Sequence, residues 1–173
     1  MAISLYDVSV VSFLQGLGGI AGFMDIGLAY CKDNDIDPGE IAEARLHPTM
    51  EPFRFQVVSA AHHSIRAIED VKRGLYLPPS KTSSLDYTGL QKLVADASDA
   101  LQQVTVAEVN ALEGRDMILS AGDLNFPFTV EGFLMSISIP NFHFHATTAY
   151  NILRAKGIPI GKLDYMGKMR LKT

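Results

Sequence analysis

The side chains with the clearest capacity for chemistry in this sequence are five histidines, at positions 47, 62, 63, 143 and 145. Imidazole titrates near neutral pH and is the commonest transition-metal ligand in proteins. Four of the five fall, two by two, within residues 50–73 and 129–156, which both show the helical spacing of apolar residues. Facing helices of a bundle can bring such side chains together around a core site. The sequence therefore predicts a polar site between these two helices.

Helical geometry indicates which histidine of the later segment faces inward. At about 100° per residue, His145 shares a mostly apolar face with Asn141, Ala149 and Ile152. His143 lies about 160° away on the same helix and should point outward. We therefore expect His145 to be buried against the earlier helix and His143 to be more exposed.

The earlier two histidines are adjacent, so only one of their rings should reach a common site. His63 lies on the same side as Gln56, beside the main apolar face, whereas His62 lies about 100° away. We take His63 as the inward residue. The candidate ligand-binding set is then Gln56, His63, Asn141 and His145.

This set allows two chemical interpretations. His63 and His145, with His62 as a substitute, would give two imidazole ligands to a divalent transition metal such as Zn²⁺ or Ni²⁺. A catalytic zinc normally has three protein ligands and a water, and the neutral Asn141 oxygen is a poor ligand for either ion. In the other interpretation the imidazoles form a metal-free cluster and hydrogen-bond inside the bundle, as buried polar groups must.

Two further motifs have simpler structural interpretations. Gly16-Leu17-Gly18-Gly19-Ile20-Ala21 matches a dinucleotide fingerprint, but such a fingerprint follows a strand, and this one lies inside a helical pattern. Its small residues are better suited to a close contact between helices. Cys31 is the only cysteine, which excludes an intramolecular disulfide, and no base stands near it in the sequence to activate a thiolate.

The elements that would position these residues are mostly helical. Helical spacing covers residues 4–31, 50–73, 85–104 and 129–156, with a shorter helix at 38–46 and a kink expected at Pro140. Residues 116–129 indicate a β-hairpin around Gly122, residues 75–84 a polar loop, and residues 161–173 a basic surface tail. We predict an all-α fold, an antiparallel four-helix bundle with one small β-hairpin before the last helix, in a single domain over residues 1–173. The alternative, an α/β fold, would need strands alternating with helices.

The composition of the chain excludes some classes of function and favours others. Fifteen Lys and Arg residues against nineteen Asp and Glu give a net charge of −4, which argues against nucleic acid as a partner. No secretory signal is evident, and Asp7 and Asp25 interrupt the first apolar helix, so we expect a cytoplasmic protein without a membrane span. The hydrophobic fraction of 47% and five glycines in the first helix predict a homodimer.

Several segments together resemble a bacterial and fungal family of unknown function. The resemblance covers nearly the whole chain and is carried by residues 4–7 (SLYD), 44–46 (ARL) with Pro48 and Met50, 56–57 (QV), 139–154 (IPNFHFHATTAYNILR) and 157–162 (GIPIGK). This family is similar to the DinB-like superfamily of damage-inducible and YfiT-type proteins, which are four-helix bundles.

The resemblance implies a particular metal site. In that superfamily one histidine of the second helix and two histidines at i and i+4 of the last helix hold a metal. His145 matches the second of that pair, the first falls on Asn141, and the helix-two ligand falls near His62 or His63. Some members are thiol transferases, and many are homodimers. Two functions follow as hypotheses. One is a small-molecule-binding protein or a protein with a degenerate metal site, and the alternative is a metal-dependent hydrolase or thiol transferase.

Overall fold

A computed structural model describes residues 3–78 and 84–172 of the chain. The fold is mostly helical, with a small three-stranded sheet. The helices are α1 (Leu5–Val8), α2 (Val10–Asp33), α3 (Pro38–Ala42), α4 (Phe53–Ala61), α5 (Ala67–Arg73), α6 (Tyr87–Gln102), α7 (Val106–Asn110), α8 (Val130–Phe133), α9 (Ile139–Ala155) and α10 (Lys162–Met166). The π-helical turn η1 (His62–Arg66) joins α4 to α5, and a second one, η2 (Leu134–Ser138), joins α8 to α9.

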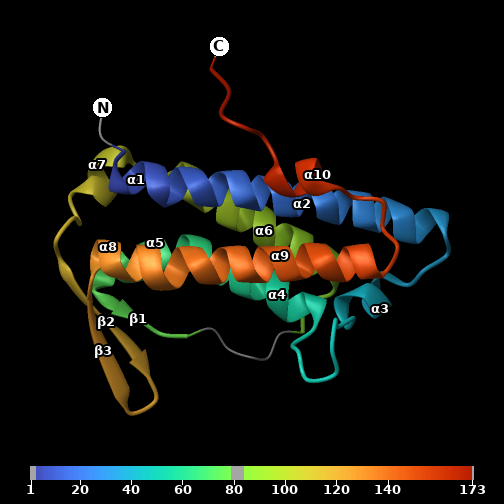
Figure 1. The fold of residues 1–173 in the computed structure, drawn as a ribbon, viewed down its shortest axis with the longest axis horizontal. Helices are drawn as coiled ribbons and strands as arrows, with labels where there is room; N and C mark the ends of the chain where they lie inside the picture. The colour runs from blue at the N-terminus through green and yellow to red at the C-terminus, as the bar shows by residue number, and fades with distance from the viewer. Residues whose placement is uncertain (1–2, 79–83, 173) are drawn as a thin grey trace.

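The long helical segments pack side by side around one core (Figure 1). Helix α9 lies against α4 and α2, and α6 packs against α2 and α4. The largest fully buried side chains are aromatic or aliphatic and come from all of these helices: Phe13, Phe23, Phe53, Tyr87, Phe133 and Phe142 among them. Burial of such side chains contributes most of the stability of the fold.

The ends of the helices follow from local sequence. Ser4 and Asp7 form a reciprocal capping box at the start of α1, and Asp37 caps α3 with Pro38 at its first position, which are residue types that favour helix starts. Gly74 ends α5 in the left-handed conformation at φ 75°, which a residue with a Cβ rarely adopts.

The sheet corrects part of the sequence-based prediction. The hairpin is present as β2 (Asp116–Ala121) and β3 (Leu124–Thr129), which pair antiparallel around Gly122 at φ 61°. A further strand, β1 (Leu75–Tyr76), pairs parallel to β2, in a segment predicted as loop. The fold is therefore mostly helical, as predicted, but its sheet has three strands where the sequence predicted a hairpin alone. Residues 79–83 of the predicted loop lie outside the described residues.

The helix count also differs from a simple four-helix bundle with one hairpin. Helix α7 was not predicted, and α10 forms within residues 161–173, which were predicted to be a surface tail. Helix α10 packs against α2 (Figure 1). Short helices of this kind carry few residues, so their periodicity is too brief to identify from a pattern.

One helical stretch of the described residues, 5–33, is long and apolar enough by length and composition to cross a membrane. That test is weak evidence, because the core helix of a soluble protein also passes it. Here the apolar side chains Phe13, Leu17, Ile20 and Phe23 fill the protein core. The stretch therefore has a structural explanation as a core helix.

The predicted disturbance at Pro140 takes the form of a π-helical turn. Pro140 has no amide hydrogen to donate, so an uninterrupted α-helix would leave one carbonyl unpaired in the preceding turn. The chain widens to the π turn η2 directly before this point and then resumes as α9. Such single-turn widenings are frequent at functional sites.

Candidate functional site

The structure brings His63 and His145 together. His63 comes from η1 and His145 from α9, and their rings stack with centroids 5.9 Å apart and planes 12° apart. His63 is only 5% exposed. His145 contacts Gln56 of α4, the second long helix, as predicted, but it is half-buried and not fully buried. His143 is exposed on another side of α9.

Gln56 determines the proton position on His145. The Gln56 amide nitrogen donates to the Glu51 carbonyl at 2.9 Å, so its amide oxygen is turned toward His145, where it lies 2.8 Å from Nδ1. An amide oxygen can only accept. His145 Nδ1 therefore carries the proton and donates it to Gln56, and the lone pair of the neutral ring lies on Nε2.

Tyr76 completes the cluster and was missed by the sequence analysis. Its hydroxyl lies 3.3 Å from both ring nitrogens of His63, and the two rings stack with centroids 5.7 Å apart. Tyr76 was not selected because residues 75–84 were predicted to form a loop. The apolar run of residues 75–77 directly after the Gly74 cap nevertheless indicates a short strand. His62 packs edge-on against Tyr76 at 5.4 Å, outside the His63–His145 stack.

A side-chain hydrogen bond links the two π-helical turns, η1 and η2, at the candidate site. The Ser138 hydroxyl, in η2, donates to the backbone carbonyl of His63, in η1, at 2.7 Å, and both residues are buried. A π turn shifts the regular hydrogen-bond register of the helix. The bond from Ser138 links η2 to η1 and holds His63 in position against α9.

Asn141 is placed near the site but bonds within its own helix. Its side-chain nitrogen donates to the Ile137 carbonyl at 2.7 Å, and the residue is half-buried. The predicted set of Gln56, His63, Asn141 and His145 thus contains a hydrogen-bonded pair, Gln56 and His145, with His63 stacked on His145. The Asn141 side chain bonds to Ile137 instead.

Burial keeps these groups uncharged. Desolvation, followed by the neighbouring rings of His62 and His145, lowers the pKa of His63 to about 3. Desolvation lowers the pKa of His145 to about 4 and raises the pKa of the Tyr76 hydroxyl well above its usual range. At neutral pH the cluster therefore consists of two neutral imidazoles, a neutral phenol and an amide.

The residues present do not fit the three-histidine metal site that the resemblance implies. Within residues 3–78 and 84–172, no group of three or more His, Cys, Asp or Glu side chains is placed to hold an ion. His63 and His145 supply two imidazoles with ring centroids 5.9 Å apart, one fewer than the three that the resemblance implies. Asn141 replaces the third imidazole with an amide, which binds Zn²⁺ and Ni²⁺ poorly.

Comparison with known structures places the fold in the DinB-like class. The crystal structure of a DinB family member protein from Shewanella denitrificans is 26% identical in sequence and superimposes with a TM-score of 0.82, and the match covers 98% of this chain and 95% of that chain. The model of one protein family, described as a domain of unknown function (DUF1993), matches residues 5–166. The chain therefore belongs to the DUF1993 family. No curated protein matches it.

Proposed function

We propose that this protein binds an uncharged small molecule at the His63–His145 cluster without a metal ion. The observation that carries the proposal is the bond from His145 Nδ1 to the Gln56 amide oxygen. It presents the Nε2 lone pair of a half-buried, neutral imidazole as a fixed hydrogen-bond acceptor. A small number of oriented polar groups in apolar surroundings is typical of small-molecule sites.

The surroundings of His145 favour an uncharged ligand with an aromatic or other flat apolar part. Phe55 and Phe144 pack edge-on against its ring, with centroids 5.7 Å and 5.2 Å away. None of the residues described above as members of the cluster carries a charge at neutral pH. An ionised ligand would lose its hydration there without gaining a countercharge, which is costly. A neutral hydroxyl or N–H donor would instead satisfy Nε2.

Phenol is a suitable probe, because its hydroxyl can donate to His145 Nε2 while its ring contacts the two phenylalanines. Protein with ¹⁵N-labelled histidine should show a saturable shift of the His145 Nε2 resonance on addition of phenol at millimolar concentration. Benzoate, a charged molecule of similar shape, should not shift it. The His145→Ala variant should lose phenol binding, and the matched His143→Ala variant should retain it. Equal responses to phenol and benzoate, or retained binding in His145→Ala, would refute the proposal.

The metal-dependent hydrolase or thiol transferase is the alternative, and a zinc titration of protein purified without a histidine tag separates the two. On our proposal Zn²⁺ and Ni²⁺ bind weakly, are removed by chelator and leave the thermal unfolding midpoint unchanged, since a structural ion would contribute much more free energy. Asn141→His restores the third imidazole and should bind Zn²⁺ more tightly than the wild type. Retention of one equivalent of metal by the wild-type protein after chelator treatment would favour the enzyme.

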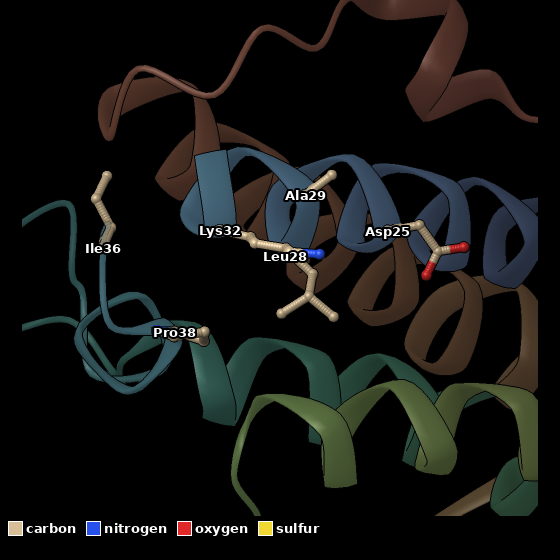
Figure 2. A pocket seen from close by; sticks show the side chains of 6 residues that line it. All are labelled: Asp25, Leu28, Ala29, Lys32, Ile36 and Pro38. Carbon is tan, nitrogen blue, oxygen red and sulfur yellow. The ribbon is translucent and has the colours of Figure 1, made fainter. Parts of the chain in front are cut away.

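We also propose that the protein is a cytoplasmic homodimer that associates through the outer face of α2. Its support is the spacing of exposed residues along that helix: Gly18, Gly22, Asp25, Ala29 and Lys32. Small residues at this spacing allow a second helix to approach closely. Asp25, Ala29 and Lys32 also line an open groove of about 590 Å³ between α2 and α3 (Figure 2).

Charge-reversal substitutions on α2 test this arrangement of the dimer. In an antiparallel two-fold arrangement, Asp25 of one subunit can face Lys32 of the other. Lys32→Glu should then give a monomer in light scattering, and the double swap Asp25→Lys with Lys32→Glu should restore the dimer. A wild-type monomer at tens of micromolar, or a double variant that does not recover, would refute this arrangement.

A further inference from the structure

A pocket with several polar side chains lies at the part of α9 that carries His143. It has a volume of about 250 Å³ and lies where α2, α9 and α10 meet, beside the C-terminal tail. Its lining includes Ser12 and Gln15 from α2, His143 from α9, Tyr165 from α10 and Arg170 from the tail. These residues are separate from those of the proposed function.

Glycines at three positions allow the helices around this pocket to pack closely against one another. A Cβ at Gly16 would overlap the ring of Phe142, and a Cβ at Gly19 would overlap the backbone carbonyl oxygen of Tyr165. Gly167 has φ 60°, and a Cβ there would lie 2.9 Å from the Gln15 carbonyl. The glycine motif of α2 therefore serves the close docking of α9 and α10.

Hydrogen bonds fix the polar side chains around the pocket. The Gln15 amide donates to the Met166 carbonyl at 3.0 Å and holds the end of α10. The Thr147 hydroxyl donates to the Tyr165 hydroxyl oxygen at 3.0 Å. The Tyr165 hydroxyl, in turn, lies 3.3 Å from His143 Nδ1 and can donate its own proton there. His143 then carries its proton on Nε2, as a hydrogen-bond donor.

The lining has positive character. Arg170 contributes a guanidinium with five N–H donors, and no carboxylate is among the lining residues. The nearby Asp7 carboxylate, which interacts with Arg170 through space, accepts hydrogen bonds from the backbone and side chain of Ser4. Asp7 keeps its negative charge in this capping box and attracts Arg170 at longer range. Among the described residues no side chain forms an ion pair or hydrogen bond with the guanidinium, so Arg170 keeps donors for a ligand.

We propose that this pocket binds the oxyanion group, carboxylate or phosphate, of a small molecule. Arg170 forms the charge-assisted hydrogen bonds to the anion, His143 donates from Nε2, and the Tyr165–Thr147 pair orients the imidazole. Guanidinium is well suited to planar or tetrahedral oxyanions because of its fork of donors. The volume leaves room for a short carbon skeleton attached to the anion.

The test is a titration of the full-length protein with sodium phosphate and, separately, sodium acetate at constant ionic strength, followed by ¹H–¹⁵N NMR. Phosphate or acetate should give saturable shifts at Ser12, Gln15 and His143, and the tighter of the two identifies the anion class. Arg170→Ala should weaken binding at least about tenfold, as expected for loss of a charge-assisted hydrogen bond. Lys172→Ala is the matched control, because it removes one positive charge from the same tail outside the pocket, and should change affinity by less than about twofold in 0.15 M salt.

A second variant tests the pocket at a residue of α9 and leaves the C-terminal tail unchanged. His143→Phe preserves a ring but removes the Nε2 donor, and should weaken binding of the same anion. Equal losses in Arg170→Ala and Lys172→Ala would mean diffuse attraction to the basic tail and would overturn the proposal. So would an unchanged affinity in His143→Phe, or the absence of saturable shifts at the pocket with both anions.

Discussion

Acidification should unfold this protein because of the two stacked imidazoles. His63 and His145 are neutral in the folded state, with pKa values lowered by burial to about 3 and about 4. In the unfolded chain an imidazole titrates near its ordinary value of about 6.5. The unfolded state therefore binds protons that the folded state does not, and stability falls as the pH falls.

The size of the loss follows from these values. The stability that depends on the neutral imidazoles is fully present well above pH 6.5. It is lost as the pH falls to about 4 for His145 and to about 3 for His63. Within that window, each imidazole lowers the free energy of unfolding at a rate approaching about 1.4 kcal/mol per pH unit. Between pH 7 and pH 4.5 the two together remove about 5 kcal/mol, which equals the whole stability of many small domains.

Urea denaturation at half-unit steps from pH 7 to pH 4.5 measures this slope. His145→Gln keeps a hydrogen-bond donor for Gln56 but cannot titrate, so its stability should fall less steeply than that of the wild type, by about 1 kcal/mol per pH unit. His47→Gln, a substitution of an exposed histidine, serves as the control and should follow the wild type. A folded-state pKa of His63 or His145 at or above 6.5 by NMR would refute the reasoning, as would an unchanged slope in His145→Gln.

Two further substitutions have matched controls nearby. Ser138→Ala should lower the free energy of unfolding in urea by about 0.5–1.5 kcal/mol, because it removes the buried hydrogen bond to the His63 carbonyl. The exposed Ser136→Ala should cost less than about 0.5 kcal/mol. Gly19→Ala should lower the thermal midpoint and speed amide exchange in α10, since its Cβ overlaps the Tyr165 carbonyl. Gly18→Ala, with nothing within 4 Å, should stabilise α2 by up to about 1 kcal/mol. Equal effects within either pair would contradict these assignments.

Periodicity predicted the long helices and the hairpin, because each has enough residues to show a repeat. Helix α2, for example, buries Phe13, Leu17, Ile20 and Met24 at the expected spacing. The two-residue strand β1 shows no repeat of its own and exists because it pairs with β2. Helix α10 likewise depends on a tertiary contact, the close approach of its backbone to Gly19. Elements stabilised by distant contacts are where local patterns fail.

The candidate site was only partly predictable for a related reason. Helical phase placed His145 toward the second helix and His143 outward, because both residues follow Pro140 on one regular helix. The same phase could not reveal the π-helical turns, which depend on bonds such as Ser138 to His63 across the bundle. Nor could it find Tyr76, whose position follows from strand pairing.

The hydrogen bonds of Gln56 and Asn141 bear on whether the candidate site suits a metal ion or a neutral ligand. A metal site needs imidazole lone pairs that converge on an ion, with further ligands to complete the shell. Gln56 instead accepts a hydrogen bond from His145 Nδ1, and the Asn141 side-chain nitrogen donates to the Ile137 carbonyl of its own helix. Burial keeps both imidazoles neutral, and the bond to Gln56 fixes which nitrogen of His145 carries the lone pair. This oriented acceptor in apolar surroundings is the feature that the proposed neutral ligand would use.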